Sequence, residues 1–348
     1  MKERVIPGIN TKEMNEIISL NHGSGGKLSR YLIEKAFVGR FNIPEPLTDS
    51  AVFDVKGAGV AFTTDSYVVD PLFFPGGNIG KLAVCGTIND LAVSGAIPAY
   101  ISAAFIIEEG FPVSDLVAIA DSMAEEAKKA GVRIITGDTK VVEKGKCDKV
   151  FITTSGTGII PEENKDMGTG SQVRPGDRIL INGPVGNHSL AVLGARGDLS
   201  FTTPVLSDCA CLNDLINSIV RDSRDIVFMR DLTRGGLATV LNELAGMVKY
   251  SIEAEESSVP VDEPVRGLCE MLGFNPLYLA NEGKFIAVVR NGSENKVLGL
   301  MRSHPLGSNS AIIGKITSDS RGLVFLNTSA GGRRNLEMLS GSQLPRIC

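Results

Sequence analysis

A polar, turn-forming segment near the middle of this sequence most constrains how the chain can fold. Residues 161–168 read Pro-Glu-Glu-Asn-Lys-Asp-Met-Gly, and residues 173–177 read Val-Arg-Pro-Gly-Asp. Because Pro, Gly, Asn and Asp interrupt helices and strands, we expect a domain boundary between residues 161 and 172. A chain of 348 residues is also too long for one ordinary core. We predict an N-terminal segment (1–42), two domains (43–165 and 166–330) and a flexible C-terminal tail (331–348).

Apolar periodicity predicts helices and strands on both sides of this boundary, which indicates an α+β protein made of two α/β-type domains. In the first half, helical spacing covers residues 28–41, 79–95 and 113–130, and strand patterns cover 51–55, 59–63, 98–107, 132–136 and 150–159. In the second half, helical spacing covers 209–220 and 235–248, and strand patterns cover 178–182, 225–230, 285–290, 310–316 and 323–326.

Composition and charge narrow the possible functions. Hydrophobic residues make up 43% and charged residues 22%, as in a well-packed soluble protein. The formal net charge of −5 argues against nucleic-acid binding, which needs a basic surface. No apolar run approaches the roughly 20 residues that span a bilayer, and the first residues lack the apolar core of a secretory signal. We expect a cytoplasmic protein with no nucleic-acid or membrane partner.

Isolated aspartates beside small or turn-forming residues carry the main chemical signal. Four of them follow or precede predicted strands and the fifth lies within a predicted helix: Asp49, Asp65, Asp138 and Asp231, and then Asp90. Ligands of α/β proteins bind where strands end, and carboxylates that share a pocket repel one another unless a divalent cation such as Mg²⁺ lies between them. We therefore expect a metal–phosphate site. Taken singly, each aspartate is equally typical of a turn or a helix cap.

A glycine-rich segment near the N-terminus is the second signal. It reads Asn-His-Gly-Ser-Gly-Gly-Lys over residues 21–27 and precedes a predicted helix. Backbone N–H groups of Gly25 and Gly26, with the Lys27 cation, can bind phosphate oxygens at such a helix start. The segment is not a Walker A motif, and a flexible linker has the same composition.

Six scattered cysteines argue against a disulfide framework. Cys209 and Cys211 are the only close pair, and the absence of a second Cys or His pair nearby in sequence argues against zinc. Cys85 lies in an apolar helical pattern and is expected in the core. Cys348 ends the sequence, either as an accidental exposed thiol or as a nucleophile on a mobile arm that carries a covalent group between two sites.

Taken together, these residues resemble the ATP-binding superfamily of aminoimidazole ribonucleotide synthetase, selenophosphate synthetase and thiamine-monophosphate kinase. The resemblance rests on the order of the aspartate motifs, including Asp231-Leu-Thr-Arg-Gly-Gly-Leu, and covers residues 20–327. The segments His22-Gly-Ser-Gly-Gly and Pro345-Arg-Ile-Cys348 closely resemble one member family, the hydrogenase expression/formation proteins HypE.

The resemblance implies a homodimer that pairs its N-terminal domains and an ATP site between domains. It implies that a HypF-type carbamoyltransferase loads a carboxamide onto the Cys348 sulfur, that this chain uses ATP to dehydrate the group to a thiocyanate, and that the cyano group passes to iron of [NiFe]-hydrogenase on a HypC/HypD-type scaffold. An extended arm from Ala330 to Cys348 reaches roughly 60 Å.

The resemblance also implies roles for individual residues. Asp49, Asp65, Asp90, Asp138 and Asp231 would hold Mg²⁺. ATP would contact Gly25, Gly26, Lys27, Asp65, Asn89, Asp90, Asp138 and Thr139. Dehydration needs a base for the amide protons, and we assign this role to Glu282, with Lys140 nearby to offset its charge.

Two other functions stay open from the sequence. A small-molecule kinase or synthetase of the same superfamily would phosphorylate a free substrate and would not need Cys348. A non-catalytic ATP-binding carrier would only deliver a group that another enzyme attaches.

Overall fold

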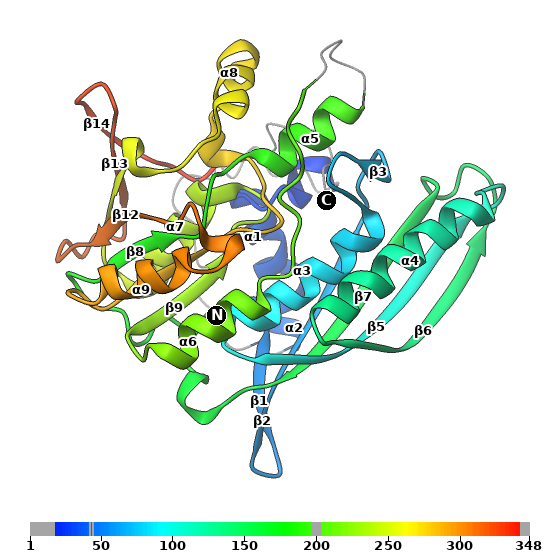
Figure 1. The fold of residues 1–348 in the computed structure, drawn as a ribbon, viewed down its shortest axis with the longest axis horizontal. Coiled ribbons are helices and arrows are strands. Elements are labelled where there is room, and N and C mark those ends of the chain that lie inside the picture. Colours follow the sequence, from blue (N-terminus) through cyan, green and yellow to red (C-terminus); the bar gives the residue numbers. More distant parts are fainter. Residues whose placement is uncertain (1–17, 42, 44, 197–202, 342–348) are drawn as a thin grey trace.

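The structure of the protein is a computed structural model that describes residues 18–41, 43, 45–196 and 203–341 (Figure 1). The described part of the chain starts with a short 3₁₀ helix (Leu20–Gly23), which a helical segment follows. The helix runs through α1 (Lys27–Ile33), a π-helical turn (Glu34–Val38) and α2 (Gly39–Phe41). The predicted helix over 28–41 is therefore confirmed. No helix in the described part of the chain is long and apolar enough to cross a membrane.

The N-terminal domain is a five-stranded sheet with two helices on one face. The strand order is β1-β2-β7-β5-β6, and only β5 and β6 pair in parallel. The strands are β1 (Ala51–Val55), β2 (Ala58–Tyr67), β5 (Ile97–Glu108), β6 (Arg133–Val142) and β7 (Val150–Ile159), and a small hairpin adds β3 (Phe73–Phe74) and β4 (Gly77–Asn78). The helices are α3 (Ile79–Val93) and α4 (Val113–Lys129).

Local sequence explains how these helices pack. The Asn78 side chain caps α3 by accepting hydrogen bonds from the N–H groups of Gly80 and Lys81. Ile119, Met123 and Ala127 recur every four residues on α4 and form its buried stripe. A side chain on Gly80 would collide with the backbone of Ile119, so this glycine lets the two helices approach closely.

Two predicted strand ends are wrong. β2 continues through Asp65 to Tyr67, and β6 continues through Asp138 to Val142, past the predicted end at 136. The Gly137-Asp138 pair has the composition of a turn, but pairing with β5 keeps the chain extended there. Both aspartates therefore lie within strands, where alternation decides which face each side chain occupies.

The C-terminal domain is a seven-stranded sheet covered on both faces. The order is β14-β13-β10-β12-β8-β11-β9. The strands are β8 (Arg178–Ile181), β9 (Ile226–Asp231), β10 (Ile252–Glu255), β11 (Phe285–Val289), β12 (Ala311–Ile316), β13 (Val324–Asn327) and β14 (Arg333–Asn335). The helices are α5 (Asn187–Ala195), α6 (Asn213–Asp222), α7 (Gly236–Val248), α8 (Glu263–Leu272) and α9 (Glu294–Arg302).

The sequence of β11 is a continuous apolar run because both faces of this strand are buried. Ile286 and Val288 pack in the same core as α7, whereas Phe285 and Ala287 pack in the core formed by α6 and α9. The end of α3, at Ala92 and Val93, joins the second core. The two domains thus share a packed junction, and α3 lies beside α6 in Figure 1.

The predicted tail begins too early. Residues 333–335 form β14 against β13, and Leu336 is buried, with its N–H donating to the carbonyl of Val324. The Leu339 carbonyl accepts a hydrogen bond from the Lys27 N–H at 3.0 Å. The hydrophobic contact of Leu336 and the strand pairing hold this segment on the fold at least to Leu339. Cys348 lies outside the described residues.

A candidate active site at the domain junction

Five carboxylates from both domains gather at the junction. Asp49, Asp65 and Asp90 come from the loop before β1, from β2 and from α3; Asp231 ends β9, and Glu282 precedes β11. Asp90 accepts a hydrogen bond from the Thr63 hydroxyl at 2.7 Å. Burial, and then the charges of Asp65, Asp231 and Asp49, raise the pKa of Asp90 well above its ordinary value. The cluster is therefore close enough for its members to repel one another.

Asp231 is the least satisfied member. Its Oδ2 atom is buried and has no hydrogen-bond partner among the described residues. Burial raises its pKa well above the ordinary value, and Asp49 and Asp65 raise it further against the opposing charge of Arg230. A buried oxygen in this state is suited to binding a cation, because an unpaired buried carboxylate is otherwise costly.

Arg230 is the principal cation beside this cluster within the described chain. Its Nε lies 3.2 Å from a carboxylate oxygen of Asp49, and its Nη1 lies 2.9 Å from Glu243 on α7. Its Nη2 donates to the Leu47 carbonyl at 2.9 Å. All three groups fix the guanidinium in place, so Arg230 holds the loop before β1 against the C-terminal sheet.

Glu282 is buried beside the cluster, with a side chain shielded from solvent. Burial, Asp231 and Asp208 raise its pKa well above the ordinary value, and Arg234 opposes them. The backbone N–H groups of Glu282 and Gly283 donate to the Asp208 carboxylate at 3.2 and 3.1 Å. Asp208, which our reading of the sequence overlooked, thereby fixes the loop that carries Glu282.

Asn89 joins the two domains. Its side-chain amide donates to the Ala210 carbonyl at 3.0 Å and accepts from the Leu212 N–H at 2.8 Å. Both ends of the amide are thus engaged by the segment before α6. The prediction that Asn89 binds nucleotide stays a prediction, whereas this positioning contact is directly visible.

Asp138, Thr139 and Lys140 are not brought to the cluster within one chain. Asp65 pairs with Thr154, Thr154 with Ala103, and Ala103 with Gly137, so β2 and β6 lie three strand spacings, or about 14 Å, apart. Asp138 pairs one position further along, which directs its side chain to the opposite face of the sheet.

Within one protomer, Lys140 therefore does not lie near Glu282, contrary to our expectation. Its Nζ forms an ion pair with Asp138 at 2.7 Å, and both side chains are mostly exposed. Within the described part of the protomer, Arg234 is the cation that opposes the raised pKa of Glu282. The sequence spacing between Asp138 and Lys140 correctly places them together, but on the open face of the sheet.

The glycine-rich segment packs against both the site and the C-terminal segment. Gly25 has a φ of +80°, and a side chain there would meet Arg234. The Gly25 N–H donates to the Ser29 hydroxyl at 2.8 Å, and the Lys27 N–H donates to Leu339. The Gly25 N–H, one of the predicted phosphate donors, is therefore engaged by the protein itself in this conformation, so a phosphate contact through it would need that bond to be released.

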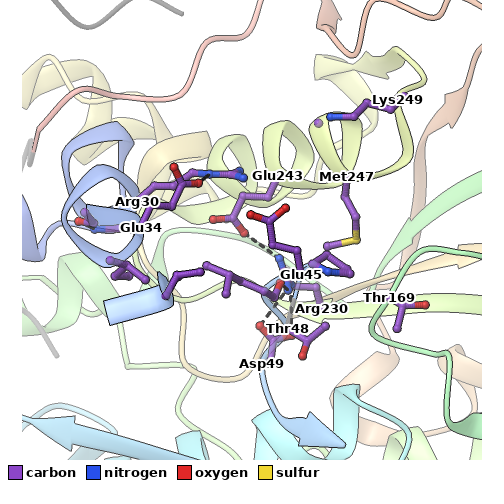
Figure 2. A pocket seen from close by; sticks show the side chains of 17 residues that line it. Arg30, Glu34, Glu45, Thr48, Asp49, Thr169, Arg230, Glu243, Met247 and Lys249 are labelled. Atoms are coloured by element: carbon purple, nitrogen blue, oxygen red, sulfur yellow. Dashed lines mark hydrogen bonds and ion pairs between the residues drawn. The ribbon is translucent and has the colours of Figure 1, made fainter. Parts of the chain in front are cut away.

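A cavity of about 480 Å³ lies between α1, the loop before β1 and α7 (Figure 2). Arg30 and Glu34 line it from the N-terminal helix, and Met247 lines it from α7. Asp49 and Arg230 form its wall toward the acidic cluster. The cavity thus adjoins the carboxylates and combines apolar, anionic and cationic groups.

Comparison with known proteins identifies the family. The model of the AIR synthase related protein, N-terminal domain, matches residues 47–160, and that of the C-terminal domain matches residues 174–327. Carbamoyl dehydratase HypE of Rhodobacter capsulatus is 49% identical over 339 residues, which cover 96% of this chain and 99% of that protein.

Solved structures agree with this similarity. A HypE–HypF complex has a TM-score of 0.82 and 46% identity, covering 88% of this chain and 99% of that one. HypE in complex with ATP has a TM-score of 0.79 and 46% identity, covering 94% and 99%. Thiamine monophosphate kinase of Aquifex aeolicus, at 15% identity and a TM-score of 0.62 over 88% and 99%, shares the fold. The chain therefore belongs to the HypE family of carbamoyl dehydratases, built from two AIR synthase-related domains.

Proposed function

We propose that this protein uses ATP to dehydrate an S-carbamoyl group on its own Cys348 to a thiocyanate, as the source of the cyano ligand for the iron of [NiFe]-hydrogenase. The family membership supports the dehydratase reaction, and the relative bound to ATP supports the nucleotide. The observation that carries the proposal is the burial of Glu282 beside aspartates from both domains.

The acidic cluster fits Mg²⁺, which prefers carboxylate and phosphate oxygens. Asp49, Asp65, Asp90 and Asp231 would hold it, and the unpartnered buried oxygen of Asp231 supports this choice. Bound there, Mg²⁺ would neutralise charge on the phosphates during phosphoryl transfer. Asp138 is left out of this set because it lies on the other face of its own sheet.

The reaction balances as two steps. The carbamoyl oxygen takes the γ-phosphoryl group of ATP as ADP leaves, and the amide nitrogen loses its first proton. The C–O bond then breaks with loss of phosphate, the second proton leaves, and the carbon–nitrogen bond becomes triple. Glu282 accepts a proton in this sequence, because its raised pKa makes it a stronger base than an ordinary carboxylate. The net change removes one water and consumes one ATP.

The anchored C-terminal segment favours delivery of Cys348 to this site. Gly341 lies against Asn21, and Leu339 lies against Gly26 beside the cavity. Seven residues, 342–348, follow this point, and an extended chain of that length reaches about 23 Å. The reach is thus shorter than the roughly 60 Å expected for an arm that is free from Ala330.

A homodimer is the second part of the proposal. The sheet face opposite α3 and α4 carries exposed apolar side chains from four strands: Phe53, Phe62, Tyr100, Ile106 and Ile159. A patch of this kind marks an interaction surface. Pairing this face with a second copy would also bring Asp138 of the partner subunit toward the acidic cluster. Mixing Asp138→Asn with Glu282→Gln protomers should then restore about a quarter of the activity, through one intact site in each mixed dimer.

The proposed partners rest on the family resemblance. A HypF-type carbamoyltransferase supplies the carbamoyl group, and the relative solved with HypF supports this contact. A HypC/HypD-type scaffold holds the iron that receives the cyano group.

One experiment tests the reaction. The full chain is carbamoylated by its partner enzyme and incubated with Mg·ATP, and the C-terminal peptide is then weighed. We expect Cys348 to lose one water in step with ATP consumption. ATP consumption with an unchanged mass would overturn the proposal. Turnover that survives Cys348→Ala would instead favour a small-molecule kinase, and ATP binding without hydrolysis would favour a carrier.

A further inference from the structure

Three side chains with metal-binding atoms meet where α3, α4 and the segment before α6 come together. They are Cys85 on α3, Glu126 on α4 and Cys211 in the segment before α6, and their ligand atoms all lie within 4.8 Å of one another. The two sulfur atoms are 3.5 Å apart. Cys85 is fully buried, whereas Cys211 and Glu126 are partly exposed. The cluster therefore has a dry base and an open side.

The sequence argued against a zinc site at Cys209 and Cys211 because no second ligand pair lies nearby along the chain. The fold supplies the further ligands from α3, which carries Cys85, and from α4, which carries Glu126. We propose that Cys85, Cys211 and Glu126 form a binding site for one thiophilic divalent cation such as Zn²⁺. This site is separate from the proposed Mg²⁺ site and takes no part in the dehydration chemistry.

The geometry suits such an ion. Two thiolates bound tetrahedrally at about 2.3 Å stand roughly 3.8 Å apart, close to the observed separation of the sulfur atoms. A carboxylate is an accepted third ligand for zinc. Cys209, two residues before Cys211, is buried in the same core cluster as Cys85 and closes the site from the inside. Small movements of the three side chains would complete the coordination.

The charges around the cluster also permit a bound dication. Glu126 pairs with Lys129 at 3.1 Å, but Lys129 also pairs with Glu125 at 2.9 Å, so Glu126 can turn toward a cation while Lys129 keeps a partner. Binding would displace the two thiol protons to solvent, because cysteine ligates zinc as thiolate. Two thiolates, one carboxylate and one dication carry a net charge of −1 beside the Lys129 ammonium.

The position of the cluster gives the site a structural consequence. Cys85 and Glu126 belong to the N-terminal domain, and Cys211 belongs to the C-terminal domain, in the segment between α5 and α6. Between Cys209 and Cys211, the Ala210 N–H donates to the Glu282 carbonyl at 3.3 Å, and the Ala210 carbonyl accepts from Asn89. A bound cation would therefore tie the domains together directly behind the loop that carries Glu282.

The test uses the reduced full chain, stripped of metal by a chelator, in a Cys348→Ser background that removes the terminal thiol. Titration with Co²⁺ should give a thiolate-to-cobalt charge-transfer band that saturates at one ion per chain. Cys85→Ser and Cys211→Ser should each abolish the band, and Glu126→Gln should weaken binding at least tenfold. Cys269→Ser, which removes a buried cysteine outside the cluster, should leave the band unchanged. Added Zn²⁺ should displace Co²⁺. It should also raise the midpoint of thermal unfolding of the Cys348→Ser parent, and leave that of the Cys85→Ser and Cys211→Ser variants unchanged.

Three results would overturn the proposal. These are the absence of the band in the parent, its persistence in both cysteine variants, or a Cys85–Cys211 disulfide found by peptide mapping in non-reduced protein that binds no cation after reduction. Cys85 lies in the core, so its variant can fail to fold. The partly exposed Cys211 gives an independent substitution that decides the question.

Discussion

The Nε atom of Arg230, on the edge strand β9 of the C-terminal sheet, lies 3.2 Å from the carboxylate of Asp49, in the loop before β1 of the N-terminal sheet. The guanidinium also binds Glu243, so one buried cation holds two carboxylates from opposite walls of the cavity. The junction between the domains is thus built partly from charge, and its stability depends on that one side chain.

Replacing Arg230 tests this dependence. Arg230→Met should destabilise the protein by about 3–5 kcal/mol, because it leaves Asp49 and Glu243 buried without their cation. The measurement is the midpoint of urea unfolding. The matched control is Arg224→Met, whose exposed ion pair with Glu163 should contribute less than about 1 kcal/mol. Equal effects of the two substitutions would show that the Arg230 pair carries no special role.

Glu282→Gln keeps the size of the side chain and removes its basicity. We expect the dehydration rate to fall by about 10²–10⁴-fold while ATP affinity changes little, because a general base acts on the transition state. Single-turnover mass spectrometry and nucleotide titration give the two quantities. Glu270→Gln, on the exposed face of α8, should leave both at the parent values. A parental rate in Glu282→Gln would assign the base elsewhere.

Stability of the metal-free protein should fall as the pH rises. The folded-state pKa values of Asp90, Asp231 and Glu282 are raised, so above the ordinary carboxyl values the folded state holds protons that the unfolded state has released. The loss therefore begins above the ordinary values, 3.8 for Asp and 4.5 for Glu, and grows as the pH approaches the raised folded-state values.

Thermal unfolding in a chelator, measured from about pH 5 to about pH 8, checks this expectation. Asp90→Asn should flatten the decline, and Mg²⁺ should stabilise the parent more at high pH, because it binds ionised carboxylates. A decline that is identical in Asp90→Asn and the parent would locate its cause outside the cluster.

The open face of the N-terminal sheet should hold two copies together. The parent should have twice the chain mass of 36.9 kDa by light scattering, and Ile106→Glu should shift it toward the monomer. Ile106 is 43% exposed on that face, whereas Val113, at the start of α4, is 73% exposed on the covered side. Val113→Glu should therefore keep the parent mass. A monomeric parent would remove the dimer and any role of Asp138 across it.

Gly26→Ala should loosen the C-terminal segment. The added methyl group would collide with the Leu339 carbonyl oxygen, whereas Gly23→Ala, the control, meets no atom within 4 Å. We expect the Lys27 amide, which donates to that carbonyl, to exchange at least tenfold faster with solvent in Gly26→Ala alone. Equal exchange in both variants would mean that the contact with Leu339 does not hold the segment.

Elements with a clear period could be predicted from the sequence. The hairpin of β1 and β2, the helices α3, α4 and α7, and the strands β8, β9, β11, β12 and β13 of the C-terminal sheet lie close to the predicted ranges. Helices α5, α8 and α9 were not predicted. Strands β10 and β14 were also missed: β10 is a short strand held between β12 and β13, and the three polar residues of β14 gain their conformation from pairing with β13.

Part of the site could also be predicted from the sequence. Asp90 and Asp231 stand out because an acidic residue in an apolar segment calls for a partner, and the structure brings them together. The strand end predicted before Asp138 was wrong because a Gly-Asp pair signals a turn, whereas here it lies within a paired strand, and strand alternation directs the Asp138 side chain to the face opposite that of Asp65. The contacts of Asp208 and the meeting of Cys85 with Cys211 depend on segments more than 70 residues apart, so no local pattern could reveal them.

The anchoring of residues 333–341 beside Gly26 has a kinetic consequence for the proposed substrate. A thiol tethered within about 23 Å of a fixed point has an effective concentration on the order of tens of millimolar toward any acceptor inside that radius. The carbamoylated cysteine would then reach the cavity by encounter alone, with no need for tight recognition of the peptide around it. An acylating partner, by contrast, would have to approach the one edge of the molecule where this tether begins.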